Sequence, residues 1–427
     1  MSRRCPCKAG SGGIYFSVHI ELASGGDKHT VNLPDRNLIA VLQPNDCCPF
    51  HDTDVALKQA AEACAAFVGD SQRLLVLVND YTRPTPNVPI LAALDATLRD
   101  RDVKYLVCLG THRPAKPPEL DAIFGASFVA AHRDRILQHD SRDKSRLFFL
   151  GKTRFGTDIW LNKELLRADK VITINSIEPH YFAGYTGGRK GLLPGVAAYD
   201  TVAANHNMVT RPGSATFGLE GNPVHEDMTE AAKMVPRPVF SIQLVQDRNH
   251  RLLAIRAGDL FKSFDEATRD AHTIFAVPVR EKADIVLSVL GPPYSIHFYQ
   301  AQRAVEFARA VLKHPSVHIT VSACFDGVGN NSFVQVFQGC RAASDVLAPR
   351  RSLESVLGWH KSARLAQIMQ TTDLYTVMGI DDAVVKSVFM HPFNTAQNAL
   401  EAAFAKLGRD ARAYIIPDAG SVVPVLV

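Results

Sequence analysis

The fold is constrained most by a series of continuous apolar runs that alternate with segments of helical periodicity. Arg73–Val78 (RLLVLV) shows no alternation of polar and apolar residues, which is typical of a strand covered on both faces. Similar runs stand at Tyr105–Leu109, Val171–Asn175 and Ile285–Leu290. Strands that alternate with helices build parallel sheets. The sequence therefore predicts an α/β protein with two α/β domains whose sheets are largely parallel or mixed.

The chain has 427 residues, enough for two domains with separate cores. We interpret residues 1–13 as a disordered leader, residues 14–280 as an N-terminal α/β domain and residues 281–410 as a C-terminal α/β domain. The final segment, residues 411–427, could return to the first domain. Gly13–Val41 alternates polar and apolar residues, as half-buried antiparallel strands do. One of the strands that we expect in the C-terminal domain lies near Val384–Phe389.

Composition excludes several classes of protein. Hydrophobic content is 46%, and the net charge of +4 comes from Lys and Arg that are spread along the chain, so we expect no nucleic-acid partner. No apolar run approaches the ~18 residues of a membrane span, and the N-terminus lacks the apolar core of a secretory signal. The eight cysteines include Cys5, Cys7, Cys47 and Cys48, which lack zinc-site spacing and have no predicted role. We expect a cytoplasmic protein with no membrane association.

Three of the predicted strands end in clusters of polar and charged residues. Asp80–Arg83 follows the first, Thr111–Arg113 the second and Glu178–His180 the third. Ligands of open α/β sheets bind at the carboxyl ends of the strands. The three clusters therefore predict one site.

These clusters contain residue types suited to binding and proton transfer. Arg83 lies in a turn fixed by prolines and could bind a carboxylate or phosphate bidentately, with Asp80 to orient it; a structural turn with a surface ion pair is an equal alternative. His112 and His180 could act as general acid and base near pH 7, or could be structural. Two histidines from different strand ends could flank a substrate carbon on opposite faces, as a racemase requires.

The stretch Glu178–His206 (EPHYFAGYTGGRKGLLPGVAAYDTVAANH) contains an unusual concentration of glycines, which indicates unusual turns or close approach to a ligand. Lys190 follows Gly187-Gly188-Arg, but the segment lacks the G-x-x-x-x-G-K-[ST] pattern of a P-loop. Lys190 could form a Schiff base, be acylated by a cofactor or bind a phosphate. His206 alone is a poor metal site, because a protein-only site needs three or four ligands.

The C-terminal domain offers two further motifs. Tyr299-Gln300-Ala-Gln-Arg303 opens a predicted helix, and the three-residue spacing places Gln300 and Arg303 on one face. Trp359 stands in Gly-Trp-His-Lys near another helix, where it could cover a site or simply pack.

Together these segments resemble the lactate racemase family, the nickel-pincer nucleotide-dependent 2-hydroxyacid racemases and epimerases. The motifs EPHYFAGYTGGRKGLLPGVAAYDTVAANH, DYTRPTP, GTHRP, YQAQR and GWHK carry the resemblance over most of the chain. It implies an isomerase with an active site in the cleft between the two domains. It also implies hydride transfer from C2 of the substrate through a 2-oxoacid intermediate, and enzymes of cofactor biosynthesis as maturation partners.

The resemblance also implies the cofactor and the residue roles. The cofactor is nickel held by pyridinium-3-thioamide-5-thiocarboxylic acid mononucleotide, the nickel-pincer nucleotide, joined covalently to Lys190. The remaining roles it implies are His206 as the metal-binding ligand, His112 and His180 as the catalytic acid and base, Gly187, Gly188 and Trp359 as cofactor-binding residues, and Asp80, Arg83, Tyr299, Gln300 and Arg303 as substrate-binding residues.

One residue departs from the family pattern. The lactate racemases that this chain resembles carry lysine at the position of Arg303. A guanidinium binds a carboxylate bidentately, whereas an ammonium is a point charge. The resemblance thus implies the 2-hydroxyacid class of substrate, and this departure leaves the particular acid open. From the residues alone, a Schiff-base enzyme using Lys190 and a non-catalytic protein that binds a phosphorylated ligand remain as alternatives.

Overall fold

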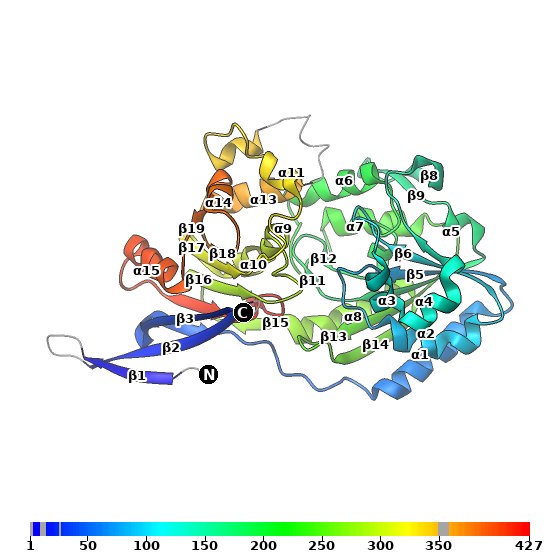
Figure 1. Cartoon of the computed structure of the whole chain (residues 1–427), viewed down its shortest axis with the longest axis horizontal. Coiled ribbons are helices and arrows are strands. Elements are labelled where there is room, and N and C mark those ends of the chain that lie inside the picture. The colour runs from blue at the N-terminus through cyan, green and yellow to red at the C-terminus, as the bar shows by residue number, and fades with distance from the viewer. Residues whose placement is uncertain (1–2, 9–13, 25–26, 349–357) are drawn as a thin grey trace. The chain divides into compact units, whose positions relative to one another are not determined.

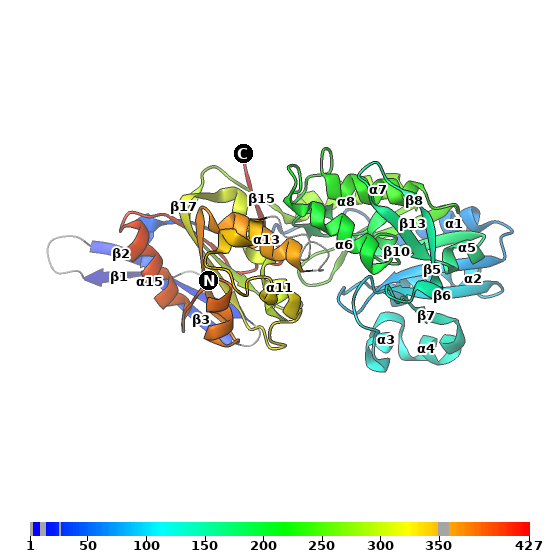
Figure 2. The same cartoon turned by 90° about the horizontal axis from the view of Figure 1, so that it is seen from above.

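The structure is a computed structural model that describes residues 3–8, 14–24, 27–348 and 358–427. Its contacts divide the chain into two compact units (Figures 1 and 2). We call Asp46–Ile274 the central unit, and Met1–Asn45 with Phe275–Val427 the terminal unit, because the latter contains both chain ends. Among the described residues, no helix combines the length and apolar composition needed to span a membrane.

The central unit is built on a six-stranded sheet in the order β14-β13-β10-β5-β6-β7, in which β14 alone runs antiparallel to its neighbour. Its strands are β5 (Arg73–Asn79), β6 (Asp102–Cys108), β7 (Ile136–Gln138), β10 (Lys170–Ser176), β13 (Val239–Gln246) and β14 (Leu252–Asp259). Two hairpins lie outside it: β8 (Leu147–Lys152) with β9 (Asp158–Asn162), and β11 (Pro179–His180) with β12 (Gly184–Tyr185).

Helices cover both faces of this sheet. They are α1 (Thr53–Val68), α2 (Asn87–Leu98), α3 (Pro117–Phe124), α4 (Ala126–His132), α5 (Glu164–Arg167), α6 (Tyr199–Asn207), α7 (Pro223–Lys233) and α8 (Leu260–Phe275), with 3₁₀ turns η2 (Arg133–Arg135), η3 (Lys144–Arg146), η4 (Gly188–Gly191) and η5 (Met208–Thr210). One face packs against α1, α2 and α3 around buried Val76, Leu94 and Ile174. The turn η4 lies against β10 and β5 and also packs on Phe264 of α8.

The terminal unit contains a second six-stranded sheet, order β19-β18-β17-β16-β20-β4, in which every pair is parallel. Its strands are β4 (Leu38–Val41), β16 (Ala283–Leu290), β17 (Leu312–Ser322), β18 (Thr372–Met378), β19 (His391–Pro392) and β20 (Ala413–Ile416). The smaller sheets are β1 (Arg3–Lys8), β2 (Ile14–Ser24) and β3 (Asp27–Pro34), which are antiparallel, and β15 (Ala276–Val279) with β21 (Val423–Leu426), which are parallel.

The two faces of this sheet have different covers. Side chains of β16 alternate, so Val286 and Leu290 pack in one core while Leu287 joins β2, β3 and α15 in the other. The helices are α9 (Phe298–Ala301), α10 (Arg303–Ala308), α11 (Asn331–Gln335), α13 (Trp359–Met369), α14 (Asp382–Ser387) and α15 (Ala396–Leu407), with η1 (Asp35–Asn37), η6 (Arg309–Val311) and η7 (Ala343–Leu347).

The structure corrects the expected domain limits. Residues 14–45, assigned from sequence to the N-terminal domain, belong to the terminal unit, because β2 and β3 bury Ile20 and Val31 against its sheet and β4 pairs with β20. The end of the chain does not return to the central unit, since β20 and β21 both pair within the terminal unit. In the expected leader, Arg3–Lys8 forms β1, while residues 1–2 and 9–13 lie outside the described residues.

The strand expected at Val384–Phe389 is instead the helix α14. The Asp381 side chain accepts a hydrogen bond from the Ala383 N–H at the start of this helix, and Val385 and Val388 turn inward three residues apart. The strand of this region is β18, which the sequence analysis missed.

Candidate active site

Three adjacent parallel strands bring the predicted polar clusters to one edge of the central sheet. Strand β5 pairs with β10 on one side and with β6 on the other, so the loops after all three strands leave from the same edge. Hydrogen bonds join these loops: Thr85 Oγ1 lies 2.7 Å from Ser176 Oγ, and the Gly110 N–H donates to the Gly195 carbonyl at 2.9 Å. The site residues of the central unit therefore lie on a connected set of loops.

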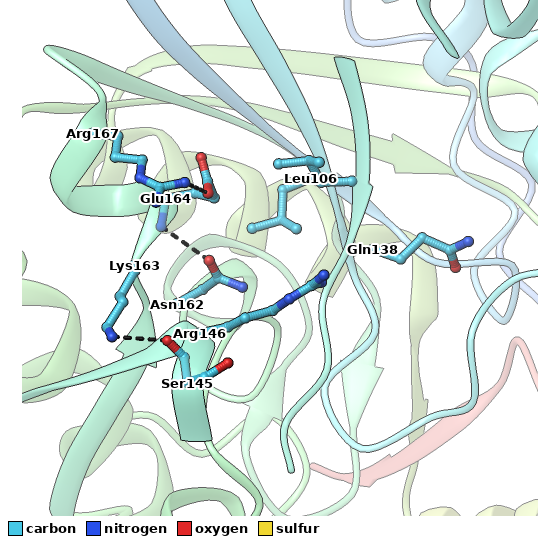
Figure 3. A pocket seen from close by; sticks show the side chains of 9 residues that line it. Leu106, Gln138, Ser145, Arg146, Asn162, Lys163, Glu164 and Arg167 are labelled. Atoms are coloured by element: carbon cyan, nitrogen blue, oxygen red, sulfur yellow. Dashed lines mark hydrogen bonds and ion pairs between the residues drawn. The ribbon is translucent and has the colours of Figure 1, made fainter. Parts of the chain in front are cut away.

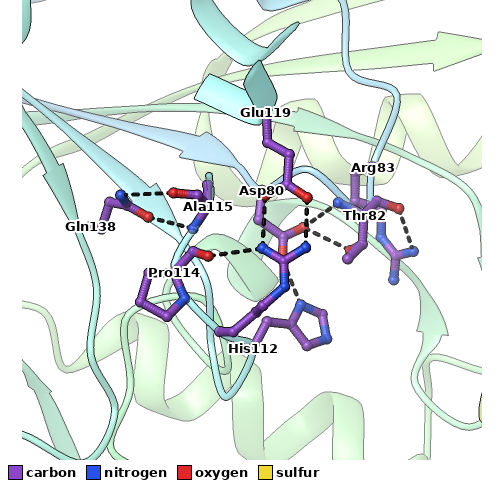
Figure 4. Close-up of polar contacts among 9 residues, drawn as sticks. Asp80, Thr82, Arg83, His112, Pro114, Ala115, Glu119 and Gln138 are labelled. Atoms are coloured by element: carbon purple, nitrogen blue, oxygen red, sulfur yellow. Dashed lines mark hydrogen bonds and ion pairs between the residues drawn. The ribbon is translucent and has the colours of Figure 1, made fainter. Parts of the chain in front are cut away.

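Asp80 and His112 form a direct pair across two of these loops (Figure 4). Asp80 Oδ2 lies 2.5 Å from His112 Nδ1, and its Oδ1 accepts from the Thr82 N–H at 3.1 Å and the Thr82 hydroxyl at 2.7 Å. The Asp80 residue is 4% exposed, whereas the His112 side chain is 45% exposed. A carboxylate on Nδ1 fixes the ring and directs Nε2 to accept or release a proton.

The charge of Asp80 is well compensated. Burial by itself raises the pKa of Asp80, but the charge and hydrogen bond of His112, the hydrogen bond from Thr82 and the charge of Arg83 hold the pKa below its ordinary value. The guanidinium of Arg83 makes one long hydrogen bond, 3.5 Å to the Thr82 carbonyl, and no other to the residues that the structure describes. Its donors are therefore available to an anion.

The pair predicts a pH-dependent contribution to stability. A carboxylate whose folded pKa is depressed stabilises the folded state above its unfolded pKa and loses that contribution as the pH falls through the folded value. We expect Asp80→Asn to lower the free energy of unfolding by about 2 kcal/mol at pH 7, and the difference from wild type to shrink below about pH 4. Urea unfolding over a pH series measures this; a constant difference down to pH 3 would contradict the assignment.

The ring of Phe182 gathers three of the residues predicted from sequence. Its centroid lies 4.4 Å from that of His180, 5.1 Å from that of His206 and 5.8 Å from Lys190 Nζ. Phe182 is itself 2% exposed. The loop after β10, the turn η4 and the helix α6 thus place an imidazole, an amine and a second imidazole around one aromatic ring.

His180 is oriented from its own loop. Its Nδ1 lies 3.3 Å from the Ala183 N–H, which acts as donor, and the ring stacks on Tyr181 at 5.2 Å. Because Nδ1 accepts, the neutral ring carries its proton on Nε2. His112 and His180 are therefore held in opposite tautomers.

The glycine turn is fixed by the sheet beneath it. Gly187 and Gly188 have φ of 74° and 52°, and the Gly188 N–H donates to Gln243 Oε1 at 3.1 Å. A Cβ at Gly187 would lie 2.2 Å from Ile177, and one at Gly188 would lie 2.6 Å from Phe264. Close packing within the unit therefore explains why these two positions require glycine. Contact of Gly187 and Gly188 with a cofactor stays a prediction.

This packing predicts that Gly188→Ala destabilises the protein by about 2–4 kcal/mol, as the sum of left-handed backbone strain and the clash with Phe264. Gly221 is the control, because its φ of 70° is also positive and a Cβ added there would meet no atom within 4 Å. Gly221→Ala should lose only the backbone part, about 1–2 kcal/mol. Equal losses in chemical denaturation would show that the Phe264 contact does not matter.

Helix α6, which carries His206, is anchored by a buried carboxylate. Asp227 on α7 is fully buried and accepts hydrogen bonds from Asn205 at 2.8 Å, Thr153 at 2.5 Å and Thr157 at 3.0 Å. Burial raises the pKa of Asp227, and these hydrogen bonds act against that rise. The sequence analysis missed Asp227 and Phe182. An aromatic residue two positions after His180 in a polar loop was the available signal for Phe182.

The terminal unit holds the other predicted residues. The Arg303 guanidinium is stacked 3.9 Å from the Tyr294 centroid and 4.8 Å from that of Phe307, and the residue is 7% exposed. Lys361 donates to the Tyr299 carbonyl at 2.6 Å, and the Gln300 N–H donates to His297 Nδ1 at 3.2 Å. The bond from Lys361 ties α13 to α9.

Trp359 carries one of the buried polar atoms of this unit that have no hydrogen-bond partner among the described residues. Trp359 Nε1 is buried and has no hydrogen-bond acceptor among the described residues. An indole N–H in this position can donate to a bound ligand; contact of Trp359 with a cofactor stays a prediction.

The described residues contain no group of three or more His, Cys, Asp or Glu side chains arranged to hold a metal ion. A metal at His206 would therefore need most of its donors from a bound organic group. Lys190 beside the same Phe182 ring offers an amine for attaching such a group. The residues present thus fit a lysine-tethered, metal-carrying cofactor.

A separate pocket of about 250 Å³ contains none of the predicted site residues (Figure 3). It is lined by Leu106, Leu137, Gln138, Ser145, Arg146, Asn162, Lys163, Glu164 and Arg167. Its cations are already engaged: Arg146 with Asp143 at 3.2 Å, Lys163 with the Ser145 carbonyl at 2.8 Å and Arg167 with Glu164 at 2.5 Å. This pocket is accordingly not assigned to the active site.

Comparison with known proteins identifies the family. Residues 25–217 match the family model of the lactate racemase N-terminal domain, and residues 279–424 match that of the lactate racemase C-terminal domain. The chain belongs to the lactate racemase family. The resemblance stated from the sequence motifs is thereby confirmed, and the chain is an isomerase.

The relatives match nearly the whole chain. A lactate racemase of Thermoanaerobacterium thermosaccharolyticum is 28% identical over 95% of this chain and 99% of its own length. One of Lactiplantibacillus plantarum is 29% identical over 82% of this chain and 84% of its own length. The structure of the lactate racemase apoprotein from T. thermosaccharolyticum superposes with a TM-score of 0.87, covering 95% of this chain and all of that one. The two-domain α/β fold class is confirmed by this match.

Proposed function

We propose that this lactate racemase family member inverts C2 of a 2-hydroxyacid with a nickel-pincer nucleotide tethered to Lys190. The observation that carries the proposal is the arrangement of His180, Lys190 and His206 around the ring of Phe182. This arrangement supports the proposal, because it brings together an amine that could form the tether, an imidazole nitrogen that could bind nickel and a second imidazole that could exchange a proton. When bound, the cofactor would supply an acceptor for the C2 hydrogen as hydride.

The chain's own residues would bind the substrate and move its hydroxyl proton. Arg83 offers a guanidinium for the carboxylate. His112, held by Asp80, presents Nε2 as a base, and His180 would act as the acid in its doubly protonated, imidazolium form. For the opposite enantiomer the two histidines exchange roles. Substrate binding by Tyr299, Gln300 and Arg303 stays a prediction from the family resemblance.

The substrate class follows from the binding groups. The named relatives are lactate racemases, so lactate is the first substrate to test. Arg303, stacked between Tyr294 and Phe307, holds a planar fork in place of the lysine expected in that family. We therefore propose a 2-hydroxyacid whose carboxylate is bound bidentately by a guanidinium.

The test is to produce the protein together with the enzymes of cofactor biosynthesis and to measure intact mass, nickel content and activity. We expect a covalent adduct on Lys190, one nickel per chain and loss of optical activity with at least one 2-hydroxyacid from a panel that includes lactate. Full racemase activity in nickel-free protein of unmodified mass would refute the cofactor assignment. A borohydride-trapped adduct on Lys190 without nickel would favour Schiff-base chemistry.

A further inference from the structure

Arg189, the residue before Lys190, is a buried cation whose hydrogen bonds within the described residues all go to main-chain carbonyls. It is 1% exposed. Its guanidinium donates to the carbonyls of Ala183 at 2.6 Å, Tyr185 at 3.0 Å and Gly187 at 3.3 Å. Its Cζ also lies 4.4 Å from the centroid of the Phe264 ring. No carboxylate in the described part of the chain forms a salt bridge with it.

Burial of this cation is energetically unfavourable. Burial lowers the pKa of the Arg189 guanidinium to about 9, against the opposing charge of Asp265. Burial and then the charge of Arg189 lower the pKa of the neighbouring His225 to about 3. A charged group removed from water needs compensating hydrogen bonds. Here the compensation comes from one short segment, residues 183–187, which must keep its shape for the guanidinium to be satisfied.

That segment connects the groups that gather around Phe182. The N–H of Ala183 donates to His180 Nδ1, while the carbonyl of the same residue accepts from Arg189. Phe182 directly precedes Ala183, and Lys190 directly follows Arg189. Gly187, the third acceptor, is the N-cap residue directly before the turn η4. One planar side chain therefore joins the His180 end of the loop to the Lys190 end.

We propose that Arg189 is a positioning residue that sets the tautomer of His180 and the place of Lys190 by holding the carbonyls of Ala183, Tyr185 and Gly187. The roles of His180 and Lys190 rest on the proposed function, but the positioning itself can be measured without cofactor or turnover. Lysine cannot replace arginine here, because an ammonium cannot present a planar fork to three carbonyls.

Arg101 provides a matched control. In the same unit its guanidinium also donates to three main-chain carbonyls, those of Thr97 at 2.9 Å, Gly69 at 2.8 Å and Ser71. It contacts none of the site loops through these bonds. Arg101 is only partly buried, so Arg101→Lys should lose the same kind of hydrogen bond at a smaller cost in stability, without altering His180 or Lys190.

The experiment compares Arg189→Lys, Arg101→Lys and wild type as full-length proteins without cofactor. In Arg189→Lys we expect the amides of residues 180–188 to exchange hydrogen at least about tenfold faster than in wild type, because two or more charge-assisted hydrogen bonds are lost. We also expect the ¹⁵N spectrum of His180 to show a mixture of tautomers. Acylation of the Lys190 amine by a small active ester, with release of the ester's leaving group, should accelerate severalfold. Arg101→Lys should show none of these three changes.

If Arg189→Lys does not fold, Arg189→Ala with added methylguanidinium replaces it, since the cation can enter the vacated space and restore the three carbonyl bonds. Recovery of slow exchange at residues 180–188 supports the proposal. Unchanged exchange, His180 tautomer and Lys190 reactivity in Arg189→Lys would overturn it, as would equal changes in Arg101→Lys. A failure of the nickel-cofactor assignment would leave these readouts in place, so the two outcomes are distinguishable.

Discussion

Replacement of Lys190 by arginine should abolish both covalent cofactor attachment and racemisation. The substitution keeps a positive charge near Phe182, where Lys190 Nζ lies 5.8 Å from the ring centroid. A guanidinium, however, is not acylated under conditions in which an amine is, because it stays protonated and its lone pairs are delocalised. Activity should therefore fall to background, and the intact mass should be that of the bare chain with the substitution.

The control is Lys152→Arg, at an exposed lysine that pairs with Asp158 at 3.0 Å on the β8–β9 hairpin. This variant should keep the adduct, the nickel and the activity of wild type. An adduct of unchanged mass in Lys190→Arg would show that the tether is at another residue. Racemisation by Lys190→Arg at the wild-type rate would contradict a tethered cofactor altogether.

Replacement of either His112 or His180 by glutamine should lower kcat/KM by about 100-fold to 10,000-fold while leaving the cofactor in place. Glutamine can hydrogen-bond but cannot exchange a proton near neutral pH. Because the equilibrium constant is set by the substrate, kcat/KM must fall by the same factor in both directions. Intact mass and nickel content should match wild type, which separates proton transfer from cofactor binding.

A suitable control for the histidines is His132→Gln. His132 lies on α4, outside the three site loops, and its ring stacks on Phe128 at 4.1 Å. We expect it to cost some stability and no turnover. If His112→Gln and His180→Gln both retain more than a tenth of wild-type kcat/KM, neither histidine is the acid or base.

Much of the central sheet was predictable, and the physical reason is burial. Runs such as Arg73–Val78 have no polar face, so they form strands covered on both sides, and the polar residues that follow them fall at the carboxyl edge. The positions of β10, β5 and β6 as neighbours in the sheet could not be predicted from the sequence, because they depend on pairing between strands that are far apart in the chain. The clustering of the three loops therefore needed the structure.

The errors have similar causes. Alternation in residues 14–34 predicted half-buried strands but could not say which sheet they cover. The apolar residues of Val384–Phe389 are compatible with either a strand or a helix. The hydrogen bond that the Asp381 side chain accepts at the N-terminus of α14 favours the helix. Arg189 was overlooked because a charged residue in a glycine-rich loop is normally exposed. Its burial depends on three carbonyls that only the folded loop brings together.

The most direct test of the central claim is to run the reaction in deuterium oxide and follow C2 of the substrate. Inversion by hydride transfer through a 2-oxoacid moves the C2 hydrogen without exchanging it with solvent, while His112 and His180 exchange only the hydroxyl proton. We predict racemised product that retains hydrogen at C2. Deuterium at C2 appearing as fast as inversion would contradict the account and indicate proton removal at carbon.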